Sequence, residues 1–430
     1  MAEPLRIGIA GLGNVGAGVV KLLHVQSDLL TQRCGKALEI AAVSARDRVR
    51  DRGVELSHVR WCDDPLKLAG DSGVDVVVEL IGGTNGVALE VAEVALAAGK
   101  SVVTANKAMM ALHGTRLART AEQRGVGLAY EAAVAGGIPV VKALREGLAG
   151  NRVERIYGIL NGTCNYILTA MEESGREFGE MLLEAQALGY AEADPGLDVD
   201  GIDAAHKLAL LTSLAFGRPI EFDSVFVEGI RNIGVVDIDY ARELGFRIKL
   251  LAIAQATANG VEQRVHPCMV LQDTPIAHVQ GVFNAVVAEG DFVDRTVYEG
   301  RGAGEGPTAS AVVADLVDLA RGNVLPAFGV PVESLTATPA VPMVDHRGAY
   351  YVRLMVLDKP GVMADVATIL RDENVSLESV LQRGQNPGEV VPVILTTHVT
   401  VEAAMRKFLQ KISELDFVIE PPLMIRIEQL

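Results

Sequence analysis

The stretch LRIGIAGLGNVG, residues 5–16, decides the fold. An apolar run, Leu5–Ala10, is followed at once by three glycines and then by a helical pattern that begins near Val15. In this strand–loop–helix setting Gly11 allows a tight turn, Gly13 lets a pyrophosphate approach the backbone, and Gly16 permits close packing of the helix. The helix N-terminus adds a field that favours negative charge. The segment therefore predicts a dinucleotide-binding loop rather than a purely structural glycine turn, with these residues in contact with the cofactor: Gly11, Gly13, Asn14, Val15 and Gly16.

The rest of the first 150 residues repeats the alternation of short β-rich runs with Ala-rich amphipathic runs. Near-continuous Val in the third run indicates a strand covered on both faces, as a parallel sheet between helix layers requires. We therefore predict an α/β, Rossmann-like parallel sheet over residues 1–150. Its further strands are expected at Leu38–Ser44, Val74–Leu80, Ser101–Thr104 and Gly127–Glu131.

The pattern changes after residue 150. Helical runs such as Asp203–Ala215 mix with β-rich pieces such as Gln263–Leu271, which predicts an α+β substrate-binding and dimerisation domain over residues 151–342. Thr336–Gly348 contains two prolines and little periodicity and is the expected linker.

Residues 349–430 show a βαββαβ order, which predicts a separate ferredoxin-like unit. Its strands are expected at Tyr350–Leu357, Val375–Leu381, Val390–His398 and Val418–Ile427, and its helices at Val362–Glu373 and Val401–Ser413.

Composition excludes several classes of protein. With 39 Lys and Arg against 55 Asp and Glu the net charge is -16, which disfavours binding to nucleic acid or to anionic lipid. No targeting signal or membrane-length apolar stretch is visible, so a cytoplasmic location is expected. The four cysteines are far apart and form neither a CxxC pair nor a cluster with His, so neither zinc nor a disulfide framework is expected: Cys34, Cys62, Cys164 and Cys268.

The end of the second predicted strand bears on the choice of cofactor. Ser44 is followed by Ala45 and Arg46, where an NAD-selective fold usually presents an acid to the ribose diol. Arg46, with Arg48 or Arg50, can instead meet a 2'-phosphate. NADP is therefore favoured, NAD stays possible, and a solvated basic turn is the alternative interpretation.

Two polar segments are candidates for substrate contacts. Lys107 follows a short β-rich run, at the sheet edge where doubly wound folds bind ligands, although a lone lysine there is often only a surface residue. Residues 161–166, NGTCNY, place several hydrogen-bonding groups beside a glycine. Such a segment suits a zwitterionic substrate, and a polar turn capping a helix is the competing interpretation.

An acidic segment holds the candidate catalytic lysine. Asp203 and Lys207 are four residues apart and share one face of a helix. A carboxylate there can bind a substrate ammonium while Lys207 exchanges a proton with the reacting oxygen; an ordinary i,i+4 salt bridge is the alternative. The neighbouring acids do not have the spacing of an EF-hand. Residues 300–308, GRGAGEGPT, form a second glycine-rich loop before a helix and can offer backbone amides to an anion, or serve only as a flexible turn.

Together these motifs resemble the homoserine dehydrogenases over about residues 5–325. The matching segments are GLGNVG (11–16), TANK (104–107), EAAVAGGIP (131–139), NGTCNYIL (161–168), GYAEADP (189–195), DVDGIDAAHK (198–207) and GAGEGPTASAVVADL (302–316). The tail, with DKPGV (358–362) and NVSLES (374–379), resembles an ACT domain, a pairing typical of the monofunctional, regulated enzymes.

The resemblance implies the reversible NAD(P)-linked interconversion of L-homoserine and L-aspartate 4-semialdehyde, in threonine and methionine biosynthesis. It implies Lys207 as the proton-transferring group, with Lys107 and Asp203 also catalytic. The implied substrate-binding residues are Glu192, Asp203, Asn161, Thr163 and Tyr190. The further cofactor residues, besides Arg46 from the argument above, are Gly82, Lys107, Gly189 and Gly304. A monovalent cation such as sodium would lie at Glu131, Val134, Gly136 and Ile138.

The resemblance also implies threonine as the effector of the C-terminal domain and a homo-oligomer, a dimer or a tetramer. The sequence departs from the family at Glu305 and Gly306, where small residues are commoner, which affects the expected fit around the nicotinamide.

Two other functions compete. Cys164, within a polar motif, can be the nucleophile of a phosphorylating semialdehyde dehydrogenase, but the sequence shows no base or positive field beside it. A non-catalytic NADP-binding sensor is the second, and the presence of both Asp203 and Lys207 argues against it.

Overall fold

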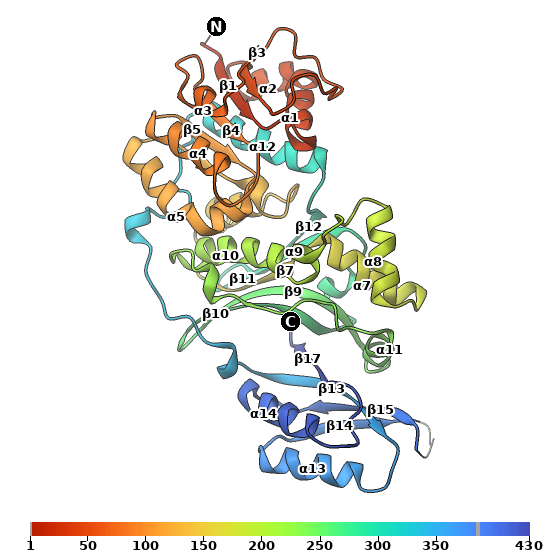
Figure 1. Ribbon diagram of the computed structural model, residues 1–430. Coiled ribbons are helices and arrows are strands. Elements are labelled where there is room, and N and C mark those ends of the chain that lie inside the picture. Colours follow the sequence, from red (N-terminus) through yellow and green to blue (C-terminus); the bar gives the residue numbers. More distant parts are fainter. Residues whose placement is uncertain (1, 384–387) are drawn as a thin grey trace.

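The computed structural model describes residues 2–383 and 388–430. Its three regions follow one another along the long axis of the molecule, with the N-terminal region at one end and the C-terminal region at the other (Figure 1). No helix among the described residues is both long and apolar enough to cross a membrane.

The N-terminal region is built on a six-stranded sheet in the order β3-β2-β1-β4-β5-β6, in which every pair is parallel. The strand order reverses at β1, as in a Rossmann fold, so the predicted sheet is confirmed. The two-residue β3 was not predicted because so short a strand carries no periodic signal. The strands are β1 (Leu5–Ala10), β2 (Leu38–Ser44), β3 (Arg60–Trp61), β4 (Val76–Glu79), β5 (Ser101–Thr104) and β6 (Leu128–Ala129).

Helices cover both faces of this sheet, and one of them comes from much later in the chain. The helix α12 (Glu305–Ala320) packs against α1, and its Val312 and Leu316 share a buried core with Ile7 and Val19. Although α12 falls within the predicted second domain, it completes the helix layer of the first region. The other helices here are α1 (Asn14–Val25), α2 (Ser27–Cys34), α3 (Pro65–Gly70), α4 (Val87–Ala97), α5 (Lys107–Arg124) and α6 (Val140–Lys142).

The middle region is the expected α+β layer. Figure 1 shows α7, α9 and α10 above a curved sheet that includes β7, β9 and β11. The strands are β7 (Val153–Ile159), β8 (Phe226–Val227), β9 (Phe246–Thr257), β10 (Gly260–Leu271), β11 (Phe283–Gly290) and β12 (Asp294–Arg301). The helices are α7 (Gly162–Ser174), α8 (Phe178–Ala187), α9 (Gly196–Val199), α10 (Ile202–Phe216) and α11 (Val235–Glu243).

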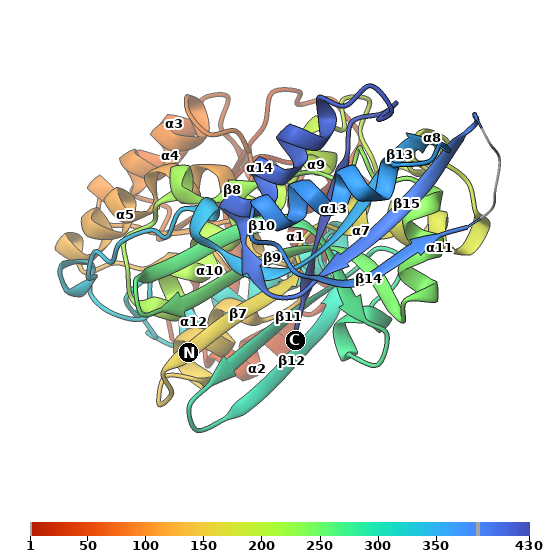
Figure 2. The same ribbon diagram turned by 90° about the horizontal axis from the view of Figure 1, so that it is seen from below.

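The C-terminal region has the predicted βαββαβ order, with strands arranged β17-β13-β15-β14. The last strand begins at Leu423 rather than at Val418, because Pro421 and Pro422 cannot donate to a ladder. Helices α13 and α14 lie on the outer face, nearest the viewer in Figure 2. The elements are β13 (Arg347–Leu357), α13 (Val362–Asp372), β14 (Leu377–Gln382), β15 (Val390–Thr397), β16 (Thr400–Val401), α14 (Glu402–Ser413) and β17 (Leu423–Glu428).

The C-terminal unit is not separate from the middle region. Its edge strand β17 pairs in parallel with β10, with Cys268 opposite Arg426 and Val270 opposite Glu428. The two sheets therefore form one eleven-stranded sheet. We call this β10–β17 contact the seam.

Candidate active site

The glycine-rich loop after β1 leaves room for a phosphate group. Gly11 has φ +105°, and a Cβ atom there would lie 2.5 Å from the carbonyl oxygen of Leu80. Gly13 caps α1, and a Cβ added to it would have no heavy atom within 4 Å. A Cβ on Gly16 would collide with the carbonyl oxygen of Gly11. The loop is thus held tight at its two ends and open in the middle, at a helix N-terminus, which suits a pyrophosphate.

A buried acid shapes the neighbouring loop and was missed in the sequence. Glu79, at the end of β4, accepts hydrogen bonds from the backbone N–H groups of Ile81 (2.7 Å) and Gly82 (3.1 Å) and from the hydroxyl of Thr104 (2.6 Å). Burial raises the pKa of Glu79. The available signal was an acid that ends an otherwise all-Val strand at the ligand-binding edge of the sheet. Gly82, at φ +81°, lies in the turn that this carboxyl group holds.

Three charged side chains from two regions meet at the centre of the site. Lys107, at the start of α5, places its Nζ 2.9 Å from one carboxylate oxygen of Asp203 on α10. Lys207, one turn along α10, places its Nζ 2.7 Å from the other oxygen and donates to the carbonyl oxygen of Leu160 at 2.6 Å. Asn161, the N-cap of α7, donates to the same oxygen of Asp203 at 2.9 Å. The predicted i,i+4 pair therefore exists, but it is part of a triad in which Asp203 and Lys207 are buried and Lys107 is partly exposed.

The two lysines have different electrostatic surroundings. Burial opposes ionisation of Asp203, but the two ammonium groups outweigh it and hold its pKa well below the usual range. The charge of Asp203 raises the pKa of Lys107, whereas burial lowers the pKa of Lys207. Lys107 is thus held as a cation, and Lys207 releases its proton more readily than an ordinary lysine. A lysine in that condition is suited to general acid–base catalysis.

The other predicted substrate residues surround this triad. Asn161 also donates to Asp198 at 2.7 Å, and the hydroxyl of Thr163 donates to the carbonyl oxygen of Tyr190 at 2.7 Å. Burial, followed by the charge of Asp203, raises the pKa of Asp198. Glu192 is exposed, two residues beyond Tyr190, and its charge contributes to the raised pKa of Lys107. The acidic segment is thus tied by hydrogen bonds to the first turn of α7, beside the triad.

Cys164 is not a thiolate nucleophile. It is buried in the first turn of α7, and its Sγ donates to the carbonyl oxygen of Asp198 at 3.2 Å. Burial, reinforced by the charges of Asp198 and Asp203, raises the pKa of this thiol well above its usual value. A thiolate nucleophile needs a nearby positive charge and access to solvent, and Cys164 has acidic neighbours and is buried instead. This environment argues against a phosphorylating semialdehyde dehydrogenase.

The remaining predicted cofactor residues lie at several places. Arg46 is exposed just after β2. Gly304, at φ +118°, caps α12, and the first residue of that helix, Glu305, packs on Gly18 of α1. Gly189, at φ +76°, directly precedes Tyr190 and so lies on the substrate side of the site.

The segment predicted to bind a cation is tightly folded. The carboxylate of Glu131 accepts from the backbone N–H groups of Val141 and Lys142, each at 2.9 Å. Burial, then repulsion from Asp315, raises the pKa of Glu131 to about 7. Gly136 has φ +50°, and a Cβ there would collide with the carbonyl oxygen of Gly302. Val134 and Ile138 lie in the same turn, and both are buried.

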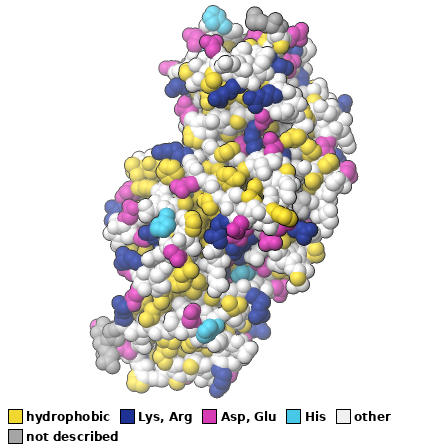
Figure 3. Space-filling model, turned by 180° about the vertical axis from the view of Figure 1, so that it is seen from behind, with side chains coloured by type: hydrophobic (Ala, Val, Ile, Leu, Met, Phe, Trp, Pro, Cys, Tyr) yellow, Lys and Arg dark blue, Asp and Glu magenta, His cyan; other side chains and the backbone are white. Residues whose placement is uncertain are grey.

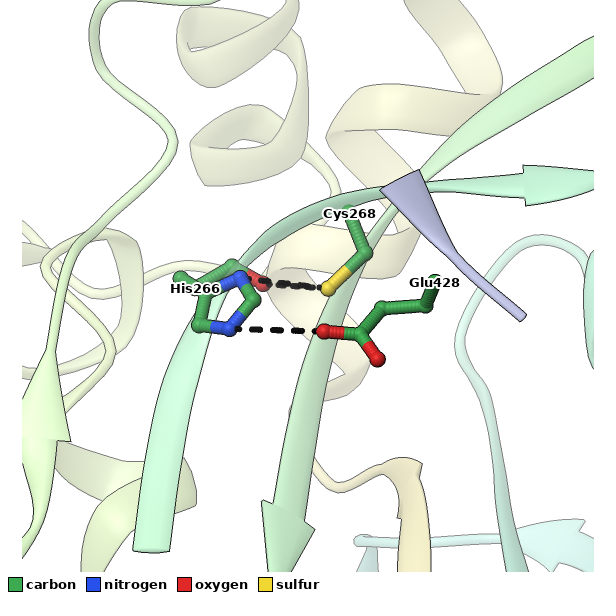
Figure 4. Close-up of side chains that lie close together, drawn as sticks. All are labelled: His266, Cys268 and Glu428. Carbon is green, nitrogen blue, oxygen red and sulfur yellow. Dashed lines mark hydrogen bonds and ion pairs between the residues drawn. The ribbon is translucent and has the colours of Figure 1, made fainter. Parts of the chain in front are cut away.

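A second cluster, at the seam, has the residue types of a metal site but not its electrostatics (Figure 4). His266, Cys268 and Glu428 are buried together, and Cys268 and His266 are in contact at 3.2 Å. Both oxygens of Glu428 accept from Arg264 at 3.1 Å. Burial, with Arg426 and Arg264, lowers the pKa of His266 far below its usual value, and burial raises that of Cys268. Because both oxygens of the Glu428 carboxylate are bonded to Arg264, this cluster forms a buried junction between β10 and β17.

The fold and the triad together define a class of protein. A Rossmann region with an open phosphate-binding loop, and a buried lysine with a lowered pKa at its ligand-binding edge, are the features of a nicotinamide-dependent dehydrogenase. Comparison with known families makes this specific. Residues 11–131 match the NAD-binding domain of homoserine dehydrogenase, residues 139–317 match the homoserine dehydrogenase family, and residues 350–417 match the ACT domain.

Individual relatives agree over the full length. The chain is 45% identical to the homoserine dehydrogenase of Pseudomonas aeruginosa, with 100% of each chain covered. It superposes on the crystal structure of a homoserine dehydrogenase from Thiobacillus denitrificans with a TM-score of 0.93 and 44% identity, over 99% of this chain and 98% of the other. A hyperthermophilic archaeal homoserine dehydrogenase in complex with NADPH matches with a TM-score of 0.63 and 28% identity, over 73% of this chain and 97% of the other. The chain belongs to the homoserine dehydrogenase family and is an oxidoreductase.

Proposed function

We propose that this chain interconverts L-homoserine and L-aspartate 4-semialdehyde with NADP, and that Lys207 transfers the proton. The observation that carries the proposal is the triad of Lys107, Asp203 and Lys207 beside the cofactor loops. In the oxidative direction the neutral amine of Lys207 accepts the proton of the substrate hydroxyl. Bound NADP would supply the acceptor for the hydride that leaves the same carbon. In the reverse direction the ammonium of Lys207 returns the proton to the oxygen that forms.

The surrounding residues have distinct tasks in this scheme. Lys107 stays charged and provides a fixed positive field at the reacting oxygen or at the carboxylate of the substrate. Asp203 and Glu192 bind the ammonium end of the substrate. Asn161 and Thr163 hold the acidic segment in place, since their side chains bond to Asp198 and to the backbone of residue 190.

The test is homoserine-dependent reduction of NADP⁺ by the purified protein and by its Lys207→Met variant. Loss of the general acid–base should lower kcat by about two to four orders of magnitude. Lys100→Met is the matched control, because Lys100 is also buried and bonded to backbone carbonyls but lies at the opposite edge of the N-terminal sheet. An inactive wild type refutes the proposed reaction, and a Lys207→Met variant as active as the control refutes the role of Lys207.

Three features support NADP rather than NAD. No acid ends β2, and Arg46 projects from the turn that follows it. The nearest acid, Asp47, already accepts from the backbone N–H groups of Val49 and Arg50. Arg52 donates to the carbonyl oxygen of Leu12 at 2.9 Å, which ties this basic turn to the glycine-rich loop.

A monovalent cation such as sodium at residues 131–138 is part of the proposal. Its support is the tight backbone of this segment, where Gly136 has φ +50°, the N–H of Val134 donates to the carbonyl oxygen of Glu131 at 3.2 Å, and the N–H of Ile138 donates to that of Ala135 at 3.0 Å. Replacing Na⁺ and K⁺ by a bulky organic cation should lower activity or thermal stability, and unchanged values would exclude the site.

Threonine is the proposed effector. A cavity of about 440 Å³ is lined by Val356–Met363 and Gln382, at the N-terminus of α13, where Gly361 has φ +99°. Such a helix N-terminus can accept the carboxylate of an amino acid. Calorimetry with threonine tests this point.

We also propose a homo-oligomer, a dimer or a tetramer, and domains at 1–150, 151–342 and 349–430. Support for association comes from the edge strand β12, which leaves Val297 exposed and adjoins the exposed Phe292. Figure 3 also shows hydrophobic side chains over the middle of the face seen from behind. Light scattering on the eluting protein distinguishes these states from a monomer.

A further inference from the structure

The buried amine of Lys249 lies below the substrate site and takes no part in the reaction described above. It projects from β9, is 1% exposed, and donates to the carbonyl oxygen of Val279 at 2.6 Å and to the side-chain oxygen of Asn165 at 3.1 Å. Both acceptors are neutral. The nearest charged groups, Glu172 and Arg247, are paired with each other at 3.1 Å.

Asn165 and Thr169, on α7, bond to the same loop, residues 279–283, as Lys249. We call these three side chains the clamp. The amide nitrogen of Asn165 donates to the carbonyl oxygens of Val279, Gly281 and Phe283 at 3.0–3.2 Å. Thr169 accepts from the N–H of Gly281 at 3.2 Å. Three side chains thus hold the backbone of residues 279–283.

This loop supports the part of α7 that faces the substrate. A Cβ on Gly162, the first residue of α7, would lie 2.8 Å from the carbonyl oxygen of Val282, so the loop is in direct contact with that turn. The preceding residue, Asn161, is the N-cap that donates to Asp198 and Asp203. A shift of the loop therefore moves Asn161 relative to the triad.

A buried ammonium without a carboxylate partner is costly to the folded state. Burial lowers the pKa of Lys249 to about 8, which reflects that cost. An apolar side chain of similar length would avoid it, so stability alone does not account for a lysine at this position.

We propose that Lys249 is a positioning residue for the substrate site, acting through Asn165 and the loop at residues 279–283. The inference rests on the proposed function, since it assigns the loop to that substrate site. A shift of Asn161 misplaces the carboxylate of Asp203, which is assigned to the substrate ammonium, so substrate binding weakens. Lys249→Met should therefore lower kcat/KM for homoserine on the order of tenfold to a hundredfold, mainly through KM, while the dissociation constant for NADP changes by less than about twofold.

The melting temperature separates positioning from simple stabilisation. Lys249→Met should melt within about 4 °C of the wild type, because relief of the buried charge offsets the loss of the two hydrogen bonds that Lys249 donates. Lys100→Met, which also removes a buried amine bonded to backbone carbonyls, should leave kcat/KM within about twofold of the wild type, as expected of a distant site. Thr169→Val removes one bond to the same loop with little change in shape, and should raise KM in the same direction but less.

The inference is overturned if Lys249→Met keeps a normal KM, or if Lys100→Met loses as much activity. It is also overturned if the melting temperature of Lys249→Met falls so far that the variant is partly unfolded at the assay temperature, since the loss of activity then reflects stability. If Lys249→Met does not fold, Thr169→Val decides: a normal KM in that variant refutes the clamp. An inactive wild type would instead refute the proposed function, and the inference with it.

Discussion

Replacing Asp203 by Asn separates the charge of this residue from its shape. The amide can still accept the hydrogen bond from Asn161, but the two ammonium groups lose their shared counter-ion. They differ in access to water: the side chain of Lys107 is 42% exposed, whereas that of Lys207 is 9% exposed. Lys107 can therefore regain hydration, and Lys207 cannot.

The expected losses of stability and of activity follow from this difference in exposure between the two lysines. Breaking a buried ion pair by removing one partner costs about 3–5 kcal/mol when the remaining charge stays in place. Lys207 can reduce this cost by losing its proton, because burial and the charge of Lys107 already lower its pKa. Each unit of pKa corresponds to about 1.4 kcal/mol. Near neutral pH the variant thus lacks the carboxylate that binds the substrate ammonium and, for the reductive direction, the protonated Lys207 that returns the proton, so kcat/KM for L-aspartate 4-semialdehyde should fall by about two to four orders of magnitude.

The assay is the pH profile of kcat/KM, together with the melting temperature. The matched control is Asp200→Asn, since Asp200 lies in the same segment but forms an exposed pair with Arg231 at 2.5 Å, of a kind worth about 0.2–1 kcal/mol. Asp203 has a pKa below its unfolded value of 3.8, so its stabilising contribution is present above that pH and is lost as the pH falls through the folded value. The stability difference between wild type and variant should therefore be full at pH 7 and shrink below about pH 4. A variant with kcat/KM close to that of the control, and with an unshifted profile, would refute the reasoning.

Two further predictions concern the cofactor and the effector. Arg46→Ala should lower the affinity for NADP about ten- to a hundredfold, the contribution of one charge-assisted contact to phosphate, and leave the affinity for NAD unchanged in fluorescence titrations. An equal loss of affinity for both cofactors would contradict the role of Arg46. Gly361→Val should abolish threonine binding in calorimetry, because a β-branched residue does not adopt φ +99° and the backbone N–H groups at the start of α13 would move. The value of kcat/KM without threonine should stay normal. Threonine binding that survives the substitution would place the effector site elsewhere.

The sequence allowed the local half of the site to be predicted. A glycine fingerprint after an apolar strand, and the four-residue spacing of Asp203 and Lys207, are both local signals, and both are present in the structure. The ion pair of Lys107 with Asp203 was not predictable in the same way, because the two residues lie in different regions of the fold and no characteristic spacing in the sequence links them. Glu79 was missed for a related reason, since a single acid at the end of a strand is informative only when the neighbouring loop is known.

Non-local packing also explains the differences in the fold. Nothing in the composition of α12 shows that it packs on α1 rather than on its neighbours in sequence. The parallel pairing of β10 with β17 joins strands more than a hundred residues apart, and an edge strand has the same alternation whether or not it has a partner.

The seam gives the C-terminal region a direct mechanical connection to the catalytic helix. Arg426 of β17 pairs with Glu228, and Val265 of β10 lies 3.2 Å from where a Cβ on Gly201 would be. Gly201 is the N-cap of α10, the helix that carries Asp203 and Lys207. A ligand in the cavity at α13 therefore changes activity only if it binds one arrangement of β17 against β10 better than another, because equal affinity for both shifts nothing. Since the same sheet continues through the seam, deleting the C-terminal region would expose β10, which packs on Gly201, and would remove the partner of Glu228, whereas a point substitution in the cavity is expected to alter effector binding alone.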